Sequence, residues 1–168
     1  MNHSSGNPYR ILIVEDDIAS RSLLSSYLSK EGYKIIETEQ ADDLCQRVQQ
    51  EQIDLVLLDI NLPGKDGLTL TRELRSVSSV GIILVTSKGD EIDRIVGLEL
   101  GADDYVTKPF NPRELLVRAK NLLWRVKDSQ QARTSEHSNN LQWCFEGWVL
   151  DSNKRLLTSP TGDSERLP

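Results

Sequence analysis

The sequence predicts an α/β fold in which five βα units build a doubly wound parallel sheet. Short apolar runs rich in Ile, Leu and Val alternate with longer segments whose apolar residues recur at helical spacing. The apolar runs show no polar alternation, which is typical of strands that helices cover on both faces. Because ligand sites in such open sheets lie beyond the carboxyl ends of the strands, we expect the functional residues there.

The expected elements follow one another from residue 10 to about residue 127. The runs expected to form strands are residues 11–14, 33–37, 55–58, 82–85 and 105–106. The segments expected to form helices are residues 18–30, 41–50, 68–77, 90–100 and 112 to about 127. Gly32 ends the first helix, because glycine terminates helices readily.

The composition changes after this first domain. Residues 128–140 contain no apolar residue except Ala132, which predicts a flexible linker. Residues 141–168 are β-rich, with strands expected over 143–150 and 154–158 and a turn at 159–162 that leads to a short third strand. The expected organisation is a flexible N-terminus (1–9), a main domain (10–127), a linker (128–140) and an incomplete antiparallel β segment (141–168).

Charge and composition exclude several classes of protein. The net charge of -6 argues against a surface that binds nucleic acid throughout, because phosphates attract clustered Lys and Arg. No apolar run approaches the roughly 20 residues that span a bilayer, and residues 1–8 contain no apolar signal core. Cys45 and Cys144 lie far apart and outside any CxxC motif, so neither a disulfide framework nor a zinc site is expected. We expect a cytoplasmic protein without a membrane partner.

Acidic side chains end the first and third expected strands. Glu15 and Asp16 follow the first strand and Asp59 follows the third, so their carboxylates should converge at one edge of the sheet. Clustered carboxylates require a counter-ion, and Mg²⁺ suits oxygen ligands, to which the backbone carbonyl of Asn61 would add another. Taken singly, each acidic residue is as well explained as a turn or helix cap, which is the role expected for Asp17.

The fourth and fifth strands bring a hydroxyl and an ammonium group to the same edge. Thr86 and Lys108 would both favour a dianionic phosphoryl group, with Asp59 as its acceptor, since phosphoryl transfer depends on positioning and charge. Singly, each of the two is more often an ordinary surface or strand-end residue, but their joint placement favours a site. Pro109 restricts Lys108 to extended geometry, and the Lys108–Pro109 bond is a candidate for the cis form.

The motifs ILIVEDD, LVLLDINLPGKDG, IILVTS and GADDYVTKPF resemble the receiver domain of two-component response regulators, which has a flavodoxin/CheY-like fold. The resemblance implies that Asp59 accepts a phosphoryl group from a sensor histidine kinase. Thr86 and Lys108 would then contact the phosphoryl oxygens, and Tyr105 would change rotamer together with Thr86. The implied Mg²⁺ ligands are Glu15, Asp16, Asp59 and the Asn61 carbonyl. The implied function is a switch with at most slow self-dephosphorylation, not an enzyme.

The run from residue 90 to residue 125 resembles the OmpR/PhoB subfamily, whose receivers pair through the fourth helix, fifth strand and fifth helix. The implied apolar centre of such a homodimer is Ile95, Leu98 and Val117. The implied charged residues around it are Arg94, Glu99, Asp103, Asp104, Glu114, Arg118 and Lys120. Without the resemblance, these charges would indicate a solvated surface with ordinary helical ion pairs.

The motif FEGWVLDSNKRLL resembles the N-terminal antiparallel sheet of the OmpR/PhoB winged-helix domain, which binds DNA and regulates transcription. No helix that would read the major groove follows before residue 168, so DNA binding is expected of the intact protein and not of this fragment. The aromatics Trp143, Phe145 and Trp148 are interpreted as sheet core, because basic residues do not interleave with them.

Two other classes of protein remain as alternatives. A Mg²⁺-dependent phosphatase that forms an aspartyl phosphate would resemble the haloacid dehalogenases, but those usually place a second Asp where this chain has Asn61. A flavodoxin-like cofactor binder would need a Gly/Ser/Thr-rich phosphate loop after the first strand, where this chain has acidic residues instead.

Overall fold

A computed structural model describes residues 8–87, 91–137, 142–145, 148–151, 156–158, 161 and 164–166. The chain divides into two compact units, Met1–Val126 and Lys127–Pro168. Among the described residues, no helix combines the length and the apolar character that crossing a membrane requires. The expected flexible N-terminus falls largely on residues 1–7, which lie outside the described residues.

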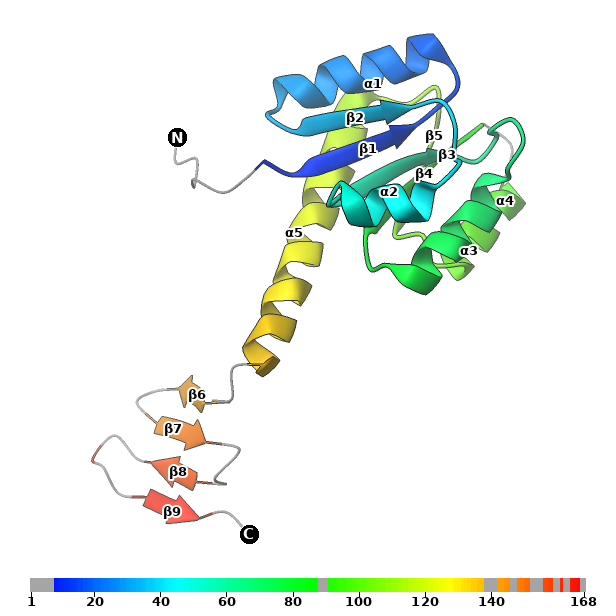
Figure 1. Ribbon diagram of the computed structural model, residues 1–168. Coiled ribbons are helices and arrows are strands. Elements are labelled where there is room, and N and C mark those ends of the chain that lie inside the picture. Colours follow the sequence, from blue (N-terminus) through cyan, green and yellow to red (C-terminus); the bar gives the residue numbers. More distant parts are fainter. Residues whose placement is uncertain are drawn as a thin grey trace. The chain divides into compact units, whose positions relative to one another are not determined.

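The first unit is a five-stranded parallel sheet with the strand order β2-β1-β3-β4-β5. Its strands are β1 (Arg10–Val14), β2 (Lys34–Thr38), β3 (Leu55–Asp59), β4 (Gly81–Ser87) and β5 (Asp104–Lys108). Its helices are α1 (Ile18–Lys30), α2 (Leu44–Gln50), α3 (Gly67–Val77), α4 (Glu91–Glu99) and α5 (Pro112–His137). Figure 1 shows α1 and α5 on one face of the sheet and α2, α3 and α4 on the other. The predicted doubly wound parallel α/β fold is confirmed.

Each face of the sheet carries its own hydrophobic core. Leu12 and Val14 of β1 belong to one cluster, with buried leucines of α2 and α3. Ile11 and Ile13 of the same strand belong to the other, with buried leucines of α1 and α5. Successive side chains of a strand point to opposite faces. Because both faces are covered, β1 is apolar and buried from Ile11 to Val14, as the sequence pattern predicted.

Helix caps explain where two of the helices begin. The Asp17 side chain accepts a hydrogen bond from the Ser20 backbone N–H at 2.8 Å, so Asp17 caps α1 as expected. The second helix was expected to begin at residue 41, which is wrong: α2 begins at Leu44. Asp43 has a φ of 59°, in the left-handed region, so a right-handed helix cannot extend back through it.

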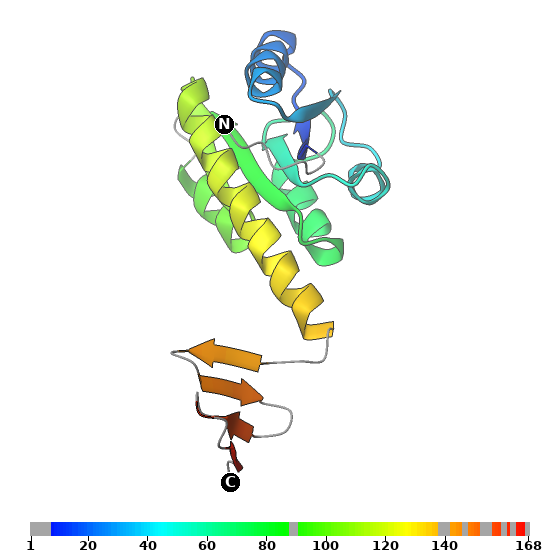
Figure 2. The ribbon, with the colours of Figure 1, turned by 90° about the vertical axis from the view of Figure 1, so that its left-hand side faces the viewer.

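The last helix is longer than expected. It was expected to end near Lys127, but α5 continues without interruption to His137, as Figure 2 shows. Residues 128–137 contain neither glycine nor proline and include Gln, Ala, Arg and Glu, which have good helix propensity. The near absence of apolar residues from 128–137 therefore does not end α5. The rest of the expected linker, residues 138–140, lies outside the described residues.

The second unit contains a four-stranded antiparallel sheet with the order β6-β7-β8-β9. Its strands are β6 (Gln142–Phe145), β7 (Trp148–Asp151), β8 (Leu156–Thr158) and β9 (Ser164–Arg166). The β-rich character was predicted, but the single strand expected over residues 143–150 was wrong. Phe145 pairs with Trp148, so this stretch forms two antiparallel strands. The apolar and aromatic residues of the two strands lie close together in the sequence, so strand propensity alone did not separate them.

Candidate functional site

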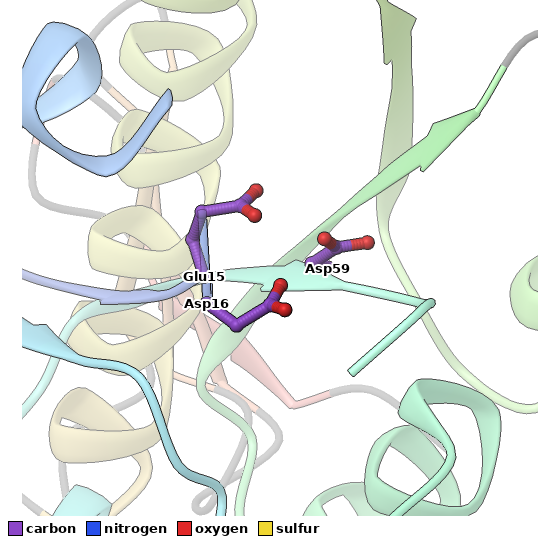
Figure 3. Close-up of side chains that lie close together, drawn as sticks. All are labelled: Glu15, Asp16 and Asp59. Atoms are coloured by element: carbon purple, nitrogen blue, oxygen red, sulfur yellow. The ribbon is translucent and has the colours of Figure 1, made fainter. Parts of the chain in front are cut away.

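Three carboxylates meet at the carboxyl edge of the parallel sheet. Strands β1 and β3 are neighbours in register, with Val14 opposite Leu58, so the residues that follow are brought together. One carboxylate oxygen each of Glu15, Asp16 and Asp59 lies within 4.8 Å of the others. Figure 3 shows the three carboxyl groups side by side. We call this group the acidic cluster.

Lys108, the last residue of β5, bridges two members of the acidic cluster. Its Nζ lies 2.9 Å from Glu15 Oε2 and 3.0 Å from Asp59 Oδ2. The two carboxylate side chains are only 2% and 5% exposed, whereas the lysine side chain is 26% exposed. The ammonium group thus supplies a positive charge to a site that is otherwise acidic and largely withdrawn from water.

Burial and ion pairing shift the pKa values of Glu15 and Lys108. Burial raises the pKa of Glu15, and the nearby Asp59 charge acts in the same direction, while the hydrogen bond from Lys108 opposes both. For Lys108, burial alone would lower the pKa, but the hydrogen bonds to Glu15 and Asp59 outweigh burial, so its pKa is raised. Lys108 is therefore held in its charged form at neutral pH.

Backbone and side-chain hydrogen bonds hold the acidic cluster in place. The Asn61 backbone N–H donates to Asp59 Oδ1 at 2.9 Å, and the Asp17 N–H donates to Glu15 Oε1 at 3.1 Å. The Arg21 guanidinium, from α1, donates to the Glu15 backbone carbonyl at 2.7 Å. The Glu15 and Asp59 carboxylates are thus oriented by the protein itself, which is how electrostatic sites avoid the cost of reorganisation.

The structure also describes the other residues expected at the site. Thr86 is 2% exposed, and its hydroxyl donates to the Ser87 carbonyl oxygen at 3.0 Å. Tyr105 is partly buried and packs against the core cluster that contains Leu84. The Lys108–Pro109 peptide bond is cis.

Hard oxygen donors are the ligands that Mg²⁺ prefers, and three carboxylate oxygens within 4.8 Å of one another fit such an ion. Three carboxylates and one ammonium group leave net negative charge here, which a divalent cation would balance. The acidic cluster thus has the chemistry of a Mg²⁺ site. The Asn61 carbonyl stays a predicted ligand, since the contacts found for Asn61 involve its backbone N–H and its side-chain amide, which donates to Ser87 Oγ at 3.4 Å.

The residues expected at a dimer interface include a second set of ion pairs, around Arg118, and several exposed apolar side chains. Arg118 donates to both oxygens of Asp104 at 2.8 and 2.9 Å and also to Glu114. Asp103 pairs with Arg75 of the same chain at 2.9 Å. Ile95, Leu98 and Val117 are exposed, as are Glu99 and Lys120, the latter 3.8 Å from Glu31. The side chain of Arg94 lies outside the described residues.

Sequence reasoning missed three residues at the site. Arg21 and Ser87 form hydrogen bonds with site residues, and although Ser87 ends the motif IILVTS, neither contact was predicted. Gly67, the first residue of α3, lies against the backbone of Asp59 and Ile60. A glycine at the start of an expected helix was the available signal for this close approach.

Comparison with known proteins agrees with this site. A family model described as the response regulator receiver domain matches residues 11–120. The aerobic respiration control protein ArcA of Escherichia coli K12 is 46% identical over 162 residues, which cover 94% of this chain and 66% of ArcA. The transcriptional regulatory protein AruR of Pseudomonas aeruginosa is 52% identical over 164 residues, with the same shares covered. The chain thus spans slightly less than two thirds of the length of these relatives.

The sequence and a solved structure of TorR are also similar to this chain. Residues 59–125 led us to expect similarity to TorR, with ArcA as the second choice, and the comparisons find both. The TorCAD operon transcriptional regulatory protein TorR of Escherichia coli K12 is 50% identical over 150 residues, covering 89% of this chain and 64% of TorR. The crystal structure of the receiver domain of the TMAO respiratory system response regulator TorR has a TM-score of 0.68 and 57% identity, and it covers 71% of this chain and 99% of that one.

The family match favours neither the phosphatase nor the flavodoxin-like alternative. The strand order of the first unit and the acidic cluster at its carboxyl edge are what such a receiver requires. The chain belongs to the response regulator receiver family: it is a two-component response regulator receiver of the OmpR type rather than a classical enzyme.

Proposed function

We propose that Asp59 is the phosphoacceptor of this receiver and that a sensor histidine kinase is the donor. The observation that carries the proposal is the position of Asp59, whose carboxylate lies beside two further carboxylates and 3.0 Å from the Lys108 ammonium. One Asp59 oxygen accepts hydrogen bonds from Lys108 and the other from the Asn61 N–H. These contacts orient the carboxylate for attack.

The reaction is a transfer between two side chains. An Asp59 oxygen attacks phosphorus and forms the new P–O bond, while the P–N bond of the kinase phosphohistidine breaks and its electron pair returns to the imidazole. Lys108 and the Thr86 hydroxyl are the donors for the phosphoryl oxygens, whose charge must be balanced as the group transfers. The product is an acyl phosphate at the edge of the sheet.

The acidic cluster, Glu15, Asp16 and Asp59 with the Asn61 carbonyl, would hold Mg²⁺. When bound, the ion supplies charge neutralisation for the phosphoryl oxygens. The chain's own part is to present these oxygens together while Glu15 and Asp59 stay nearly excluded from water.

Phosphorylation would act as a switch between two populations. The Thr86 hydroxyl, which donates to the Ser87 carbonyl in this structure, turns toward the phosphoryl group, and the partly buried Tyr105 ring packs into the space released. The active form pairs through α4, β5 and α5. If that form is a small minority before phosphorylation, a differential stabilisation of a few kcal/mol makes it the majority.

We further propose that the antiparallel sheet β6–β9 begins a winged-helix DNA-binding domain. Its strand pairing and the relatives' description as transcriptional regulators support this assignment. In the intact protein, located in the cytoplasm, dimerisation would place two such domains on repeated DNA half-sites and so control transcription. The test is to extend the chain with the codons that follow residue 168. Failure of the extended protein to bind DNA would refute the assignment.

The experiment that tests the phosphoacceptor uses acetyl phosphate as donor, with and without Mg²⁺. We expect intact-protein mass spectrometry to detect one added phosphoryl group with Mg²⁺ and none after chelation, and sedimentation to shift toward a dimer. Asp59→Asn should abolish the mass increase. Asp54→Asn is the matched control, because Asp54 precedes β3 at the end opposite Asp59, and Asn keeps a side-chain oxygen that can accept from the Arg10 N–H. Phosphorylation of Asp59→Asn would refute the acceptor, and unchanged sedimentation would refute the dimer.

A further inference from the structure

The first residue of α3 lies directly against the backbone of the proposed phosphoacceptor. A Cβ atom at Gly67 would lie 2.6 Å from the Cα of Ile60 and 2.7 Å from the carbonyl oxygen of Asp59. Both neighbours are backbone atoms, which cannot rotate away as a side chain would. Any side chain at this position must therefore displace either α3 or the segment that carries Asp59.

Hydrogen bonds hold the segment between Asp59 and Asn61 on two sides. The Ile60 N–H donates to the Val85 carbonyl of β4 at 3.0 Å, and the Ile60 carbonyl accepts from the Gly67 N–H at 3.0 Å. The backbone of Ile60 is thus held by hydrogen bonds to both β4 and α3. Because the Asn61 N–H donates to Asp59 Oδ1, a movement of the Ile60 peptide would also move the carboxylate of Asp59.

Side-chain hydrogen bonds also stabilise the first turn of α3. The Thr71 hydroxyl, which is completely buried, donates to the Gly67 carbonyl at 2.8 Å. Asp66 caps the helix by accepting from the Leu68 N–H. The turn that contacts Ile60 is therefore held from both ends.

We propose that Gly67 is a positioning residue for the phosphoacceptor, with Thr71 as its support. This inference rests on the function proposed above. The missing side chain lets α3 begin close enough to hold the Ile60 carbonyl, which fixes the Asp59 carboxylate and the backbone of Asn61 relative to Glu15 and Asp16. Gly67 touches neither phosphoryl group nor metal. It acts through the backbone of residues 59–61.

The test compares Gly67→Ala with Gly81→Ala. A Cβ at Gly81 would meet side-chain atoms of Leu122 and Leu55 at 3.2 Å, at the amino end of β4 and so at the sheet edge opposite the acidic cluster. Calorimetric titration with Mg²⁺, the rate of phosphorylation by acetyl phosphate at saturating Mg²⁺ and the midpoint of urea unfolding are measured for each. The Mg²⁺ titration does not depend on phosphorylation, so it tests Gly67 even if the proposed acceptor is wrong.

We expect Gly67→Ala to weaken Mg²⁺ binding and to slow phosphorylation by about 10-fold or more, since misplacement on the order of 1 Å has large effects on transfer rates. Gly81→Ala should lower the unfolding midpoint while keeping both functional values within about twofold, the precision expected of such comparisons. The proposal is overturned if Gly67→Ala keeps both values, or if Gly81→Ala loses them equally. If Gly67→Ala fails to fold, variants of Thr71 test the inference instead. Thr71→Val should weaken Mg²⁺ binding, and Thr71→Ser, which keeps the hydroxyl, should bind Mg²⁺ as the wild type does. Wild-type Mg²⁺ affinity in Thr71→Val would refute the inference.

Discussion

Two regions of the first unit place one cation between two carboxylates, and they differ in burial rather than in distance. Lys108 lies 2.9 Å from Glu15 and 3.0 Å from Asp59. Arg118 lies 2.8 Å from Asp104 and 2.9 Å from Glu114. The carboxylates of the first group are 2% and 5% exposed, whereas those of the second are 22% and 52% exposed.

Burial decides what each group can do. Water screens the ion pairs of Arg118, so they contribute little to stability and can exchange partners at low cost. Such pairs suit the reversible dimerisation that we propose for this surface. The ion pairs of Lys108 have little water to replace them, so removing one member leaves a buried charge uncompensated. A phosphoryl group added there changes the balance of charges strongly, as a switch requires.

The largest expected effect comes from removing the buried cation. Lys108→Ala should reduce the free energy of unfolding at pH 7 by about 3 kcal/mol, because Glu15 and Asp59 lose their counter-charge. Urea denaturation without Mg²⁺ measures this value, and added Mg²⁺ should restore part of it. The control is Lys65→Ala, which removes a shorter but exposed ion pair, 2.7 Å from Glu73, and should leave the unfolding midpoint essentially unchanged. Equal losses in the two variants would show that burial does not separate the regions.

The next effect concerns the coupling between the two regions. Thr86→Ala should still accept a phosphoryl group at Asp59, because the attacking carboxylate and Lys108 are untouched. The phosphorylated variant should dimerise about 10-fold more weakly than the phosphorylated wild type, a coupling of about 1.4 kcal/mol. Sedimentation at several concentrations measures the dissociation constant. A variant that dimerises as tightly as the wild type would break the proposed connection from Thr86 through Tyr105 to the α4–β5–α5 surface.

A smaller effect is the pH dependence of stability that Glu15 introduces. Burial raises the pKa of this carboxyl above its ordinary value of 4.5, so the folded state binds the proton more tightly than the unfolded state. In metal-free protein the contribution of Glu15 is therefore fully present below pH 4.5 and is lost as pH rises through the folded-state pKa. Glu15→Gln should remove this loss, which urea denaturation across pH 4 to pH 8 would detect as the difference between the two proteins. An identical pH profile for both would contradict the prediction.

The smallest expected effect comes from the exposed cation. Arg118→Ala should cost under about 1 kcal/mol of unfolding free energy, although the guanidinium makes four hydrogen bonds to Asp104 and Glu114. Urea denaturation at low and high salt measures it, and the loss should shrink at high salt. A loss as large as that of Lys108→Ala would remove the distinction between the two regions.

The sequence predicted most of the fold because its patterns are local. Apolar runs such as residues 55–58 identified the buried strands, and Asp17 was identified as a helix cap. The errors were also local: the start of α2 at Leu44, the length of α5 and the hairpin between Phe145 and Trp148. Each depends on backbone geometry or helix continuity that apolar spacing does not encode.

By itself the sequence determined which residues stand at the strand ends, and hence that Glu15, Asp16, Asp59 and Lys108 converge at one edge of the sheet. Parallel strands share one direction, so residues far apart in the chain meet wherever their strands end. Only the tertiary structure decided that Lys108 bridges Glu15 and Asp59 while Arg118 pairs within its own surface, and that Gly67 lies against the backbone of Asp59 and Ile60. Burial and close backbone contact arise from packing between elements, which the residue types in a motif do not specify.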